Sequence, residues 1–188
     1  MNTIFSKNLK KHLEVGGKVG LLEHVVFLAT DICLHTIKSG GKIMLCGNGG
    51  SAADCQHIAA ELTGKFQRPR DPIGAVALTT DTSAITCIGN DFSYDMIFER
   101  QVRAIGRVGD CLIGISTSGN SKNVLEAIKC ANKIGIKTIG MLGNDGGTLK
   151  NECGISIVVP DESTARVQEY HILIGHSICE GIELGLGF

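Results

Sequence analysis

The chain has 188 residues, of which 43% are hydrophobic and 4% aromatic, so it is long enough to bury one mainly aliphatic core. Its 18 basic and 19 acidic residues give a formal net charge of -1, which provides no electrostatic basis for binding nucleic acid or an anionic membrane. The eight cysteines include no Cys-x-x-Cys pair, which excludes the zinc and redox motifs built on such pairs.

The N-terminus carries charges where a signal peptide needs an apolar stretch, and no run approaches the roughly 20 apolar residues of a membrane span. Several cysteines lie inside apolar runs, where a thiol packs as a small hydrophobic group. We therefore expect a cytoplasmic protein with reduced cysteines and no contact with a membrane.

A helical pattern of apolar residues extends from about Asn2 to Lys38, and we expect Gly16 and Gly17 to divide it into two helices. The pattern contains more apolar residues than a monomer readily covers. We expect a single domain over residues 1–188, with a helical oligomerisation arm at 1–39 and an α/β core at 40–188.

Short apolar runs alternate with helix-like segments in the rest of the chain. The expected strands are continuously apolar, as is typical of a parallel sheet covered on both faces, and lie at 42–46, 73–78, 111–116, 137–142 and 155–159. The expected helices lie at 51–63, as a pair across 82–105, at 123–134, near Thr148 and at 163–184. Right-handed crossovers then predict a three-layer α/β/α sandwich around a five-stranded parallel sheet.

The first expected strand leads directly into a glycine-rich segment, GNGGS, at residues 47–51. Gly49 and Gly50 permit positive φ and let a ligand approach the backbone. Asn48 and Ser51 offer hydrogen bonds suited to sugar hydroxyls. The same segment is also compatible with a tight strand-to-helix turn that binds no ligand.

His57 and Glu61 lie four residues apart on the helix that follows, and therefore share one face. This spacing suits two metal ligands or an acid–base pair, although a surface ion pair has the same spacing. The rest of the helix is rich in alanine and apolar residues, and it begins at a loop suited to a ligand. These two features favour a functional role.

The third expected strand ends in ISTSGNS at residues 115–121, ahead of another helix. The four hydroxyls of Ser116, Thr117, Ser118 and Ser121 lie at the positive end of this helix, which suits a phosphate monoester. An ordinary N-cap is the alternative. The segment is neither a P-loop nor a dinucleotide fingerprint, because no Gly-Lys-Ser/Thr follows it and the glycine spacing is wrong. Both loops leave carboxyl ends of strands, so we expect them to converge on one ligand.

The last expected helix places two polar residues of functional type, Gln168 and His176, on similar sides. His171, on the same helix, is compatible with a core or interface histidine. Periodicity alone does not pair this helix with His57 and Glu61. Arg68 and Arg70 are expected at the surface, or at a subunit boundary where they help to hold a phosphate. Asp161 and Glu162 are expected to be solvated loop carboxylates.

Four segments, in this order along nearly the whole chain, closely resemble the phosphoheptose isomerases of the sugar isomerase (SIS) domain superfamily: LCGNGGSAADCQHIAAELTGKF, LTTDTSAITCIGND, GISTSGNSKNVLEA and RVQEYHILIGHSICE. The serine-rich segment is shared across the superfamily and indicates only a phosphosugar. The combination of His57 and Glu61 with Gln168 and His176 is far more specific. The resemblance implies a flavodoxin-like fold and a homotetramer with sites between subunits.

By this resemblance the chain interconverts sedoheptulose 7-phosphate and D-glycero-D-manno-heptose 7-phosphate through an enediol, in the first step of ADP- or GDP-heptose precursor synthesis for lipopolysaccharide or capsule. One zinc ion per subunit is expected on His57, Glu61, Gln168 and His176. Glu61 and His176 are the expected catalytic acid–base pair, because a carboxylate and an imidazole transfer protons near neutral pH. Substrate contacts are expected at Asn48, Gly49, Gly50, Ser51, Glu61, Asn90, Asp91, Ser116, Thr117, Ser118, Ser121 and Gln168.

The main alternative is a protein without catalytic activity. One relative in the superfamily is a tetramer that binds the replication initiator protein. The presence of His57, Glu61, Gln168 and His176 together favours the enzyme. Sugar-sensing regulators and other phosphosugar isomerases normally carry a fused partner domain, for which 188 residues leave no room.

Overall fold

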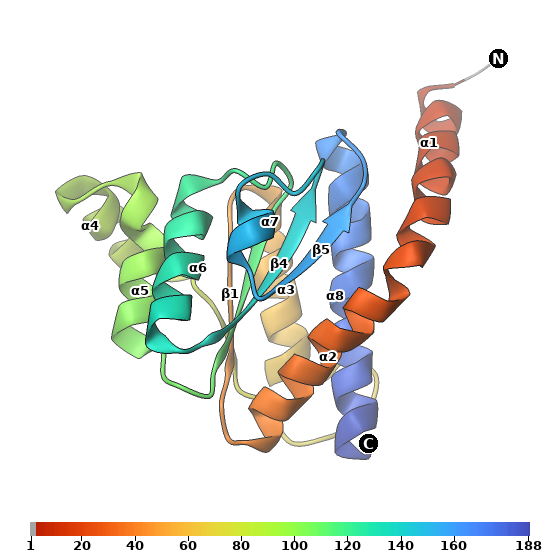
Figure 1. The fold of residues 1–188 in the computed structure, drawn as a ribbon. Coiled ribbons are helices and arrows are strands. Elements are labelled where there is room, and N and C mark those ends of the chain that lie inside the picture. Colours follow the sequence, from red (N-terminus) through yellow and green to blue (C-terminus); the bar gives the residue numbers. More distant parts are fainter. Residues whose placement is uncertain (1–2) are drawn as a thin grey trace.

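The computed structural model describes residues 3–188, and a five-stranded sheet lies between two layers of helices (Figure 1). The strands pair in the order β2-β1-β3-β4-β5, and every pairing is parallel. Their bounds are β1 (Ile43–Gly47), β2 (Ala75–Ala77), β3 (Cys111–Ser116), β4 (Lys137–Gly143) and β5 (Ile155–Val159). The predicted three-layer α/β/α sandwich is confirmed.

Each face of the sheet is covered by its own helix layer. The first layer contains α2 (Glu23–Lys38), α3 (Gly50–Thr63) and α8 (Thr164–Leu186), and α1 (Ile4–Val19) packs against α8 and projects beyond the sheet (Figure 1). The second contains α4 (Thr82–Asp91), α5 (Ile97–Ile105), α6 (Lys122–Ile134) and α7 (Leu149–Glu152). Two short 3-10 helices complete the fold: η1 (Gly20–Leu22) connects α1 to α2, and η2 (Tyr94–Met96) lies between α4 and α5.

The continuously apolar strand sequences follow from burial on both faces. Successive side chains of a strand point to opposite faces. In β1, Ile43 and Leu45 belong to the core of the first helix layer, whereas Met44 and Cys46 belong to the core of the second. No face of this strand is left for polar residues.

The second strand is shorter than the sequence predicted. Residues 73–78 are apolar, but only Ala75–Ala77 pair with β1 as a strand. Ile73 is buried and donates its N–H to the carbonyl of Leu62, at the end of α3. The apolar sequence at Ile73 therefore reflects burial beside α3 rather than strand pairing.

Gly16 and Gly17 do not divide the N-terminal helix, contrary to prediction. Helix α1 continues through both to Val19, and η1 then connects it to α2. Gly16 serves packing instead, because a Cβ there would lie 2.8 Å from the hydroxyl oxygen of Tyr170 on α8. The predicted start of the helix at Asn2 lies outside the described residues.

The apolar side chains of this arm are largely exposed. Ile4, Phe5, Leu13, Leu21 and Phe27 are each more than half accessible to solvent. Residues Ile4–Lys38 form one helical segment that contains a window of mean hydropathy 1.4. By length and composition alone, this segment could span a membrane. The sequence-based expectation that no segment is apolar enough for a membrane span is therefore corrected. Core helices and signal sequences pass the same test, so it does not place the segment in a membrane.

His171 is a fully buried core residue of α8. Its Nε2 lies 3.0 Å from the carbonyl oxygen of Leu142, and its Nδ1 has no hydrogen-bond partner among the described residues. Burial disfavours the imidazolium ion and lowers the pKa of His171 to about 4, although the Leu142 carbonyl acts in the opposite direction.

We predict that the free energy of unfolding decreases as pH falls from 6.5 to about 4. Over this range the unfolded chain binds a proton at His171 and the folded chain does not, so the loss approaches about 3 kcal/mol. Urea unfolding at a series of pH values measures it. His171→Gln should remove this part of the pH dependence, and an unchanged dependence in that variant would contradict the assignment.

Candidate active site

Two loops leave the sheet side by side where the strand order reverses. Gly47, the last residue of β1, is the neighbour of Ile115 in β3. The glycine-rich loop after β1 and the serine-rich loop after β3 therefore start at the same edge, as the sequence predicted. In doubly wound parallel sheets, this switch point is where ligands bind.

The glycine-rich loop is fixed by an amide network. Asn48 and Asn123 exchange two hydrogen bonds of 2.8 Å through their carboxamides, and the Tyr94 hydroxyl donates to Asn48 Oδ1 at 3.0 Å. Gly49 has a φ of 56°, in the left-handed region, and Ser51 is buried. Sequence reasoning missed Tyr94 and Asn123, because no local pattern links them to a residue 46 or 75 positions away.

The serine-rich loop turns tightly into α6. Ser116 Oγ and Ser121 Oγ lie 2.9 Å apart, and Ser121 makes no capping hydrogen bond with its side chain. Gly119 has a φ of 67°, and a Cβ there would lie 2.1 Å from the carbonyl oxygen of Gly146. The hydroxyls of Ser116 and Ser121 face each other beside the first N–H groups of α6, an arrangement suited to an anion.

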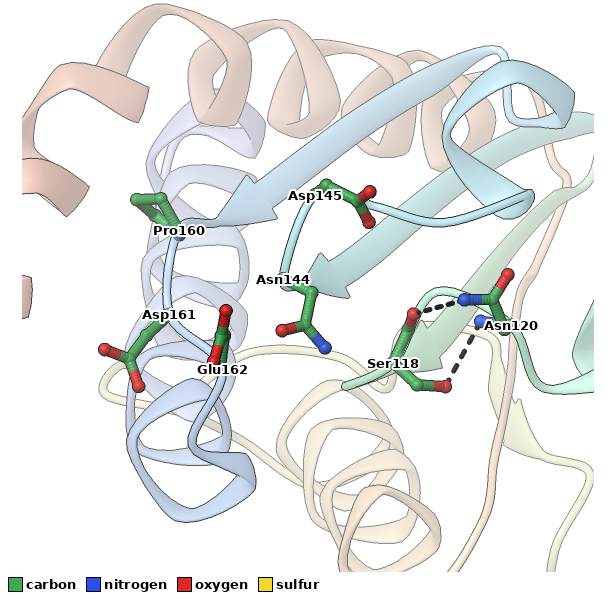
Figure 2. Close-up of a pocket in the computed structure, with 7 residues that line it drawn as sticks. All are labelled: Ser118, Asn120, Asn144, Asp145, Pro160, Asp161 and Glu162. Atoms are coloured by element: carbon green, nitrogen blue, oxygen red, sulfur yellow. Dashed lines mark hydrogen bonds between the residues drawn. The ribbon is translucent and has the colours of Figure 1, made fainter.

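A hollow of about 460 Å³ lies on the other side of this loop (Figure 2). Its lining residues are Ser118, Asn120, Asn144, Asp145, Pro160, Asp161 and Glu162. The Ser118 hydroxyl accepts the N–H of Asn120 and keeps its own proton for donation. Three acidic residues line this hollow and disfavour a bound phosphate, so the hollow is less suited to an anion than the side of the loop with Ser116 and Ser121.

Helices α3 and α8 bring His57, Glu61 and His176 together. His57 Nε2 lies 3.0 Å from Glu61 Oε1 and 3.1 Å from His176 Nε2. One ligand atom from each of the three residues lies within 4.8 Å of the others. Tertiary packing therefore brings His176 to His57 and Glu61, which the periodicity of the sequence could not predict. The centre of the Phe66 ring lies 5.2 Å from the centre of the His176 ring.

A glycine lets the two helices approach at this point. A Cβ on Gly175 would lie 2.6 Å from Cδ1 of Ile58. Gly175 directly precedes His176, and Ile58 directly follows His57. On each helix, the residue that makes the close contact is therefore the sequence neighbour of a histidine of the cluster.

The three side chains form a donor set suited to a divalent cation. Two imidazole nitrogens 3.1 Å apart share at most one hydrogen-bonding proton, and a carboxylate oxygen lies beside them. Lone pairs thus converge on a small volume. Two histidines and a carboxylate are ligands typical of zinc.

Gln168 does not join this cluster by any hydrogen bond in residues 3–188. Its carboxamide packs against the start of α3, where a Cβ on Gly50 would lie 2.4 Å from Nε2. Eight residues of helix separate it from His176, a rise of about 12 Å. Gly50 therefore provides the space that the Gln168 side chain occupies.

Asn90 and Asp91 lie in the opposite helix layer, at the exposed end of α4. Asn90 donates to Asp91 Oδ1 at 2.8 Å, and this bond, followed by the Cys87 thiol, lowers the pKa of Asp91. In the part of the chain that the structure describes, neither residue hydrogen-bonds to another predicted site residue. Within one chain, Asn90 and Asp91 are thus not joined to the histidine cluster.

Comparison with known proteins gives the family. The SIS domain model matches residues 22–143. A phosphoheptose isomerase from Aliarcobacter butzleri is 51% identical over 184 residues, which cover 97% of each chain. The chain belongs to the phosphoheptose isomerase family.

Solved structures of this family have the same fold. The phosphoheptose isomerase of Neisseria gonorrhoeae superposes with a TM-score of 0.91 at 43% identity, covering 96% of this chain and 97% of that one. The one from Francisella tularensis gives a TM-score of 0.93 at 33% identity, with 96% of each chain covered. The family, the SIS fold and the isomerase class predicted from the sequence are confirmed, and no comparison supports the initiator-binding alternative.

We predict that Gly175→Ala separates α8 from α3 and weakens the binding of a divalent metal. Overpacking against Ile58 costs about 1–3 kcal/mol, partly offset by the higher helix propensity of alanine. Gly181→Ala is the matched control on the same helix, because its Cβ would lie 2.5 Å from Thr30 on α2 instead. Urea unfolding and metal titration measure both effects, and equal metal affinity in the two variants would contradict the role of the Gly175 contact.

Proposed function

We propose that the chain interconverts sedoheptulose 7-phosphate and D-glycero-D-manno-heptose 7-phosphate. The observation that carries this proposal is the convergence of His57, Glu61 and His176 between α3 and α8, in a chain whose neighbouring strands β1 and β3 also present a glycine-rich and a serine-rich loop. A proton-transfer cluster together with a phosphate loop is what a ketose–aldose isomerase of phosphosugars requires.

The phosphate is bound by the serine-rich loop in this proposal. The hydroxyls of Ser116, Thr117, Ser118 and Ser121 and the N-terminal N–H groups of α6 are its donors. The glycine-rich loop, at Asn48, Gly49, Gly50 and Ser51, lies against the sugar hydroxyls. Asn90, Asp91 and Gln168 complete the proposed contacts, the first two across a boundary between subunits.

Glu61 and His176 transfer the protons. Glu61 removes a proton from C1 of the ketose, and the C–H electron pair forms the C1–C2 double bond of the enediol. The carbonyl oxygen at C2 takes a proton from His176. In the second half, His176 takes the O1–H proton, the C1 carbonyl forms, and C2 receives the proton held by Glu61, so both residues return to their starting states. No atom or electron is gained or lost, as isomerisation requires.

One zinc ion per subunit fits the donor set of His57, Glu61 and His176. Such an ion would act as a Lewis acid toward the carbonyl and enediolate oxygens. Gln168 is the proposed fourth ligand, which requires its carboxamide to leave the space beside Gly50. A ligated carboxylate is a weaker base, so the two roles of Glu61 alternate as substrate binds.

We propose a homotetramer in the cytoplasm whose sites lie between subunits. The exposed apolar residues of the arm, among them Leu21 and Phe27, support this assembly because a free monomer would leave them in water. The aldose product supplies the first intermediate for activated heptose, used in lipopolysaccharide or capsule.

We predict that Glu61→Gln abolishes isomerisation while the fold is kept. The carboxamide is isosteric with the carboxylate but accepts no proton, so kcat should fall by about 10²–10⁴. NMR of sedoheptulose 7-phosphate in D₂O, with and without a chelator, measures turnover and the entry of deuterium beside the carbonyl. Turnover of the variant near that of the wild type would exclude Glu61 as the base.

We also predict that light scattering at micromolar concentration gives a mass four times the 19.9 kDa of one chain. Leu21→Glu on the arm should lower that mass, since a buried charge opposes association. Lys10→Glu is its control, because Lys10 lies on the same arm with an exposed polar side chain. A wild-type monomer would contradict the tetramer and the placement of sites between subunits.

A further inference from the structure

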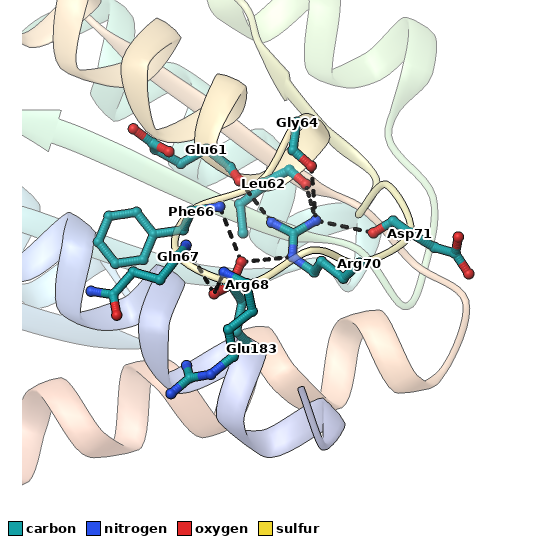
Figure 3. Close-up of polar contacts among 9 residues, drawn as sticks. All are labelled: Glu61, Leu62, Gly64, Phe66, Gln67, Arg68, Arg70, Asp71 and Glu183. Carbon is teal, nitrogen blue, oxygen red and sulfur yellow. Dashed lines mark hydrogen bonds and ion pairs between the residues drawn. The ribbon is translucent and has the colours of Figure 1, made fainter.

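A buried ion pair joins the loop after α3 to the last turns of α8 (Figure 3). Arg70 Nε lies 2.9 Å from Glu183 Oε1, and both side chains are completely shielded from solvent. The expectation of a surface charge at Arg70 is therefore wrong. Each of its three guanidinium nitrogens donates within the chain, and the side chain is shielded from solvent, so Arg70 is not placed to bind a phosphate.

Arg70 caps the C-terminal end of α3. Its Nη2 donates to the carbonyl of Glu61 at 2.7 Å, and its Nη1 donates to the carbonyl of Leu62 at 2.8 Å, with longer bonds to Gly64 and Asp71. The last carbonyls of a helix lack intrahelical donors, and a cation stabilises them. Arg70 thus holds the backbone of the residue proposed as the base.

Glu183 holds the loop that follows α3. Its carboxylate accepts the N–H groups of Phe66, Gln67 and Arg68 at 3.0, 3.1 and 3.2 Å. Burial raises the pKa of Glu183, but these N–H donors and Arg70 outweigh it, so the pKa lies below its ordinary value. The carboxylate is therefore charged, and it fixes Phe66, whose ring lies against the ring of His176.

We propose that Arg70 and Glu183 are positioning residues for the acid–base and metal site. Arg70 fixes Glu61 through its carbonyl, and Glu183 seats Phe66 against His176. In the described residues, neither makes a hydrogen bond to the side chain of His57, Glu61 or His176. The inference rests on the proposed function, because it assigns a task to the pair only where Glu61 and His176 transfer protons and bind the metal.

The test compares Arg70→Lys and Glu183→Gln with a matched control. Lysine keeps the charge but has a single nitrogen, so it cannot reproduce the bonds that Arg70 makes from three nitrogens to Glu183, Leu62 and Glu61. Glutamine at 183 lacks the negative charge. Asp110→Asn is the control, since Asp110 is also buried, accepts the N–H groups of Lys42 and Arg107, and pairs with Lys42 Nζ at 2.6 Å. Asp110 directly precedes β3 and makes no hydrogen bond or ion pair with α3 or α8 in the described residues.

We expect Arg70→Lys and Glu183→Gln to lower kcat and zinc affinity by about tenfold each, as loss of supporting contacts does at metal sites. KM for sedoheptulose 7-phosphate should change little, because the serine-rich loop is not attached to the ion pair. The control should lose thermal stability but keep kcat and zinc affinity. All assays are run at a temperature at which circular dichroism shows each variant folded.

A folded Arg70→Lys or Glu183→Gln with the kcat and zinc affinity of the control would overturn the proposal and leave a purely structural ion pair. Phe66→Leu keeps the ion pair and tests the second path even if both other variants fail to fold. Unchanged kcat and zinc affinity in that variant would overturn the role of Phe66 and Glu183. No turnover and no zinc binding in the wild type would instead overturn the proposed function, and the wild-type measurement distinguishes the two failures.

Discussion

The candidate site depends on the close contact of α3 and α8. Gly175 on α8 packs against Ile58 on α3 with no space for a side chain, and the residues next to these two are His176 and His57. At the far ends of the same helices, Arg70 and Glu183 join the two elements through a second, charged contact. Packing at one point and an ion pair at another fix both the distance and the orientation of the helices, so the histidines and Glu61 need no local motif to meet.

The parallel sheet places the other half of the site. Strands β1 and β3 are neighbours, so the glycine-rich and serine-rich loops leave the same edge although the last residues of the two strands, Gly47 and Ser116, are 69 positions apart in the sequence. The amide pair of Asn48 and Asn123 then links the start of α3's loop to α6 across the switch point. In the proposed function, the first helix layer supplies the groups for proton transfer and metal binding, and the second supplies the positive helix end for phosphate.

The sequence predicted the fold well because each strand is buried on both faces and each helix has a clear apolar pattern. It predicted His57 and Glu61 as a pair because four residues on a helix set their geometry locally. It could not pair them with His176, nor find Asn123 or the Arg70–Glu183 ion pair, because these contacts join distant segments. Arg70 was misjudged for the same reason: its polar surroundings in sequence gave no sign that Glu183 buries it. Asn90 and Asp91 were predicted only by resemblance, and one subunit does not unite them with the cluster.

The central claim is that His57, Glu61 and His176 hold one divalent metal ion at the proton-transfer site. X-ray absorption at the zinc edge of the zinc-loaded protein tests it most directly, since the eight unpaired cysteines offer a clear alternative ligand type. The account predicts one zinc per chain with nitrogen and oxygen ligands at about 2.0–2.2 Å, an imidazole signature, and loss of that signature in His57→Ala. A sulfur shell at about 2.3 Å, or an unchanged spectrum in His57→Ala, would contradict it.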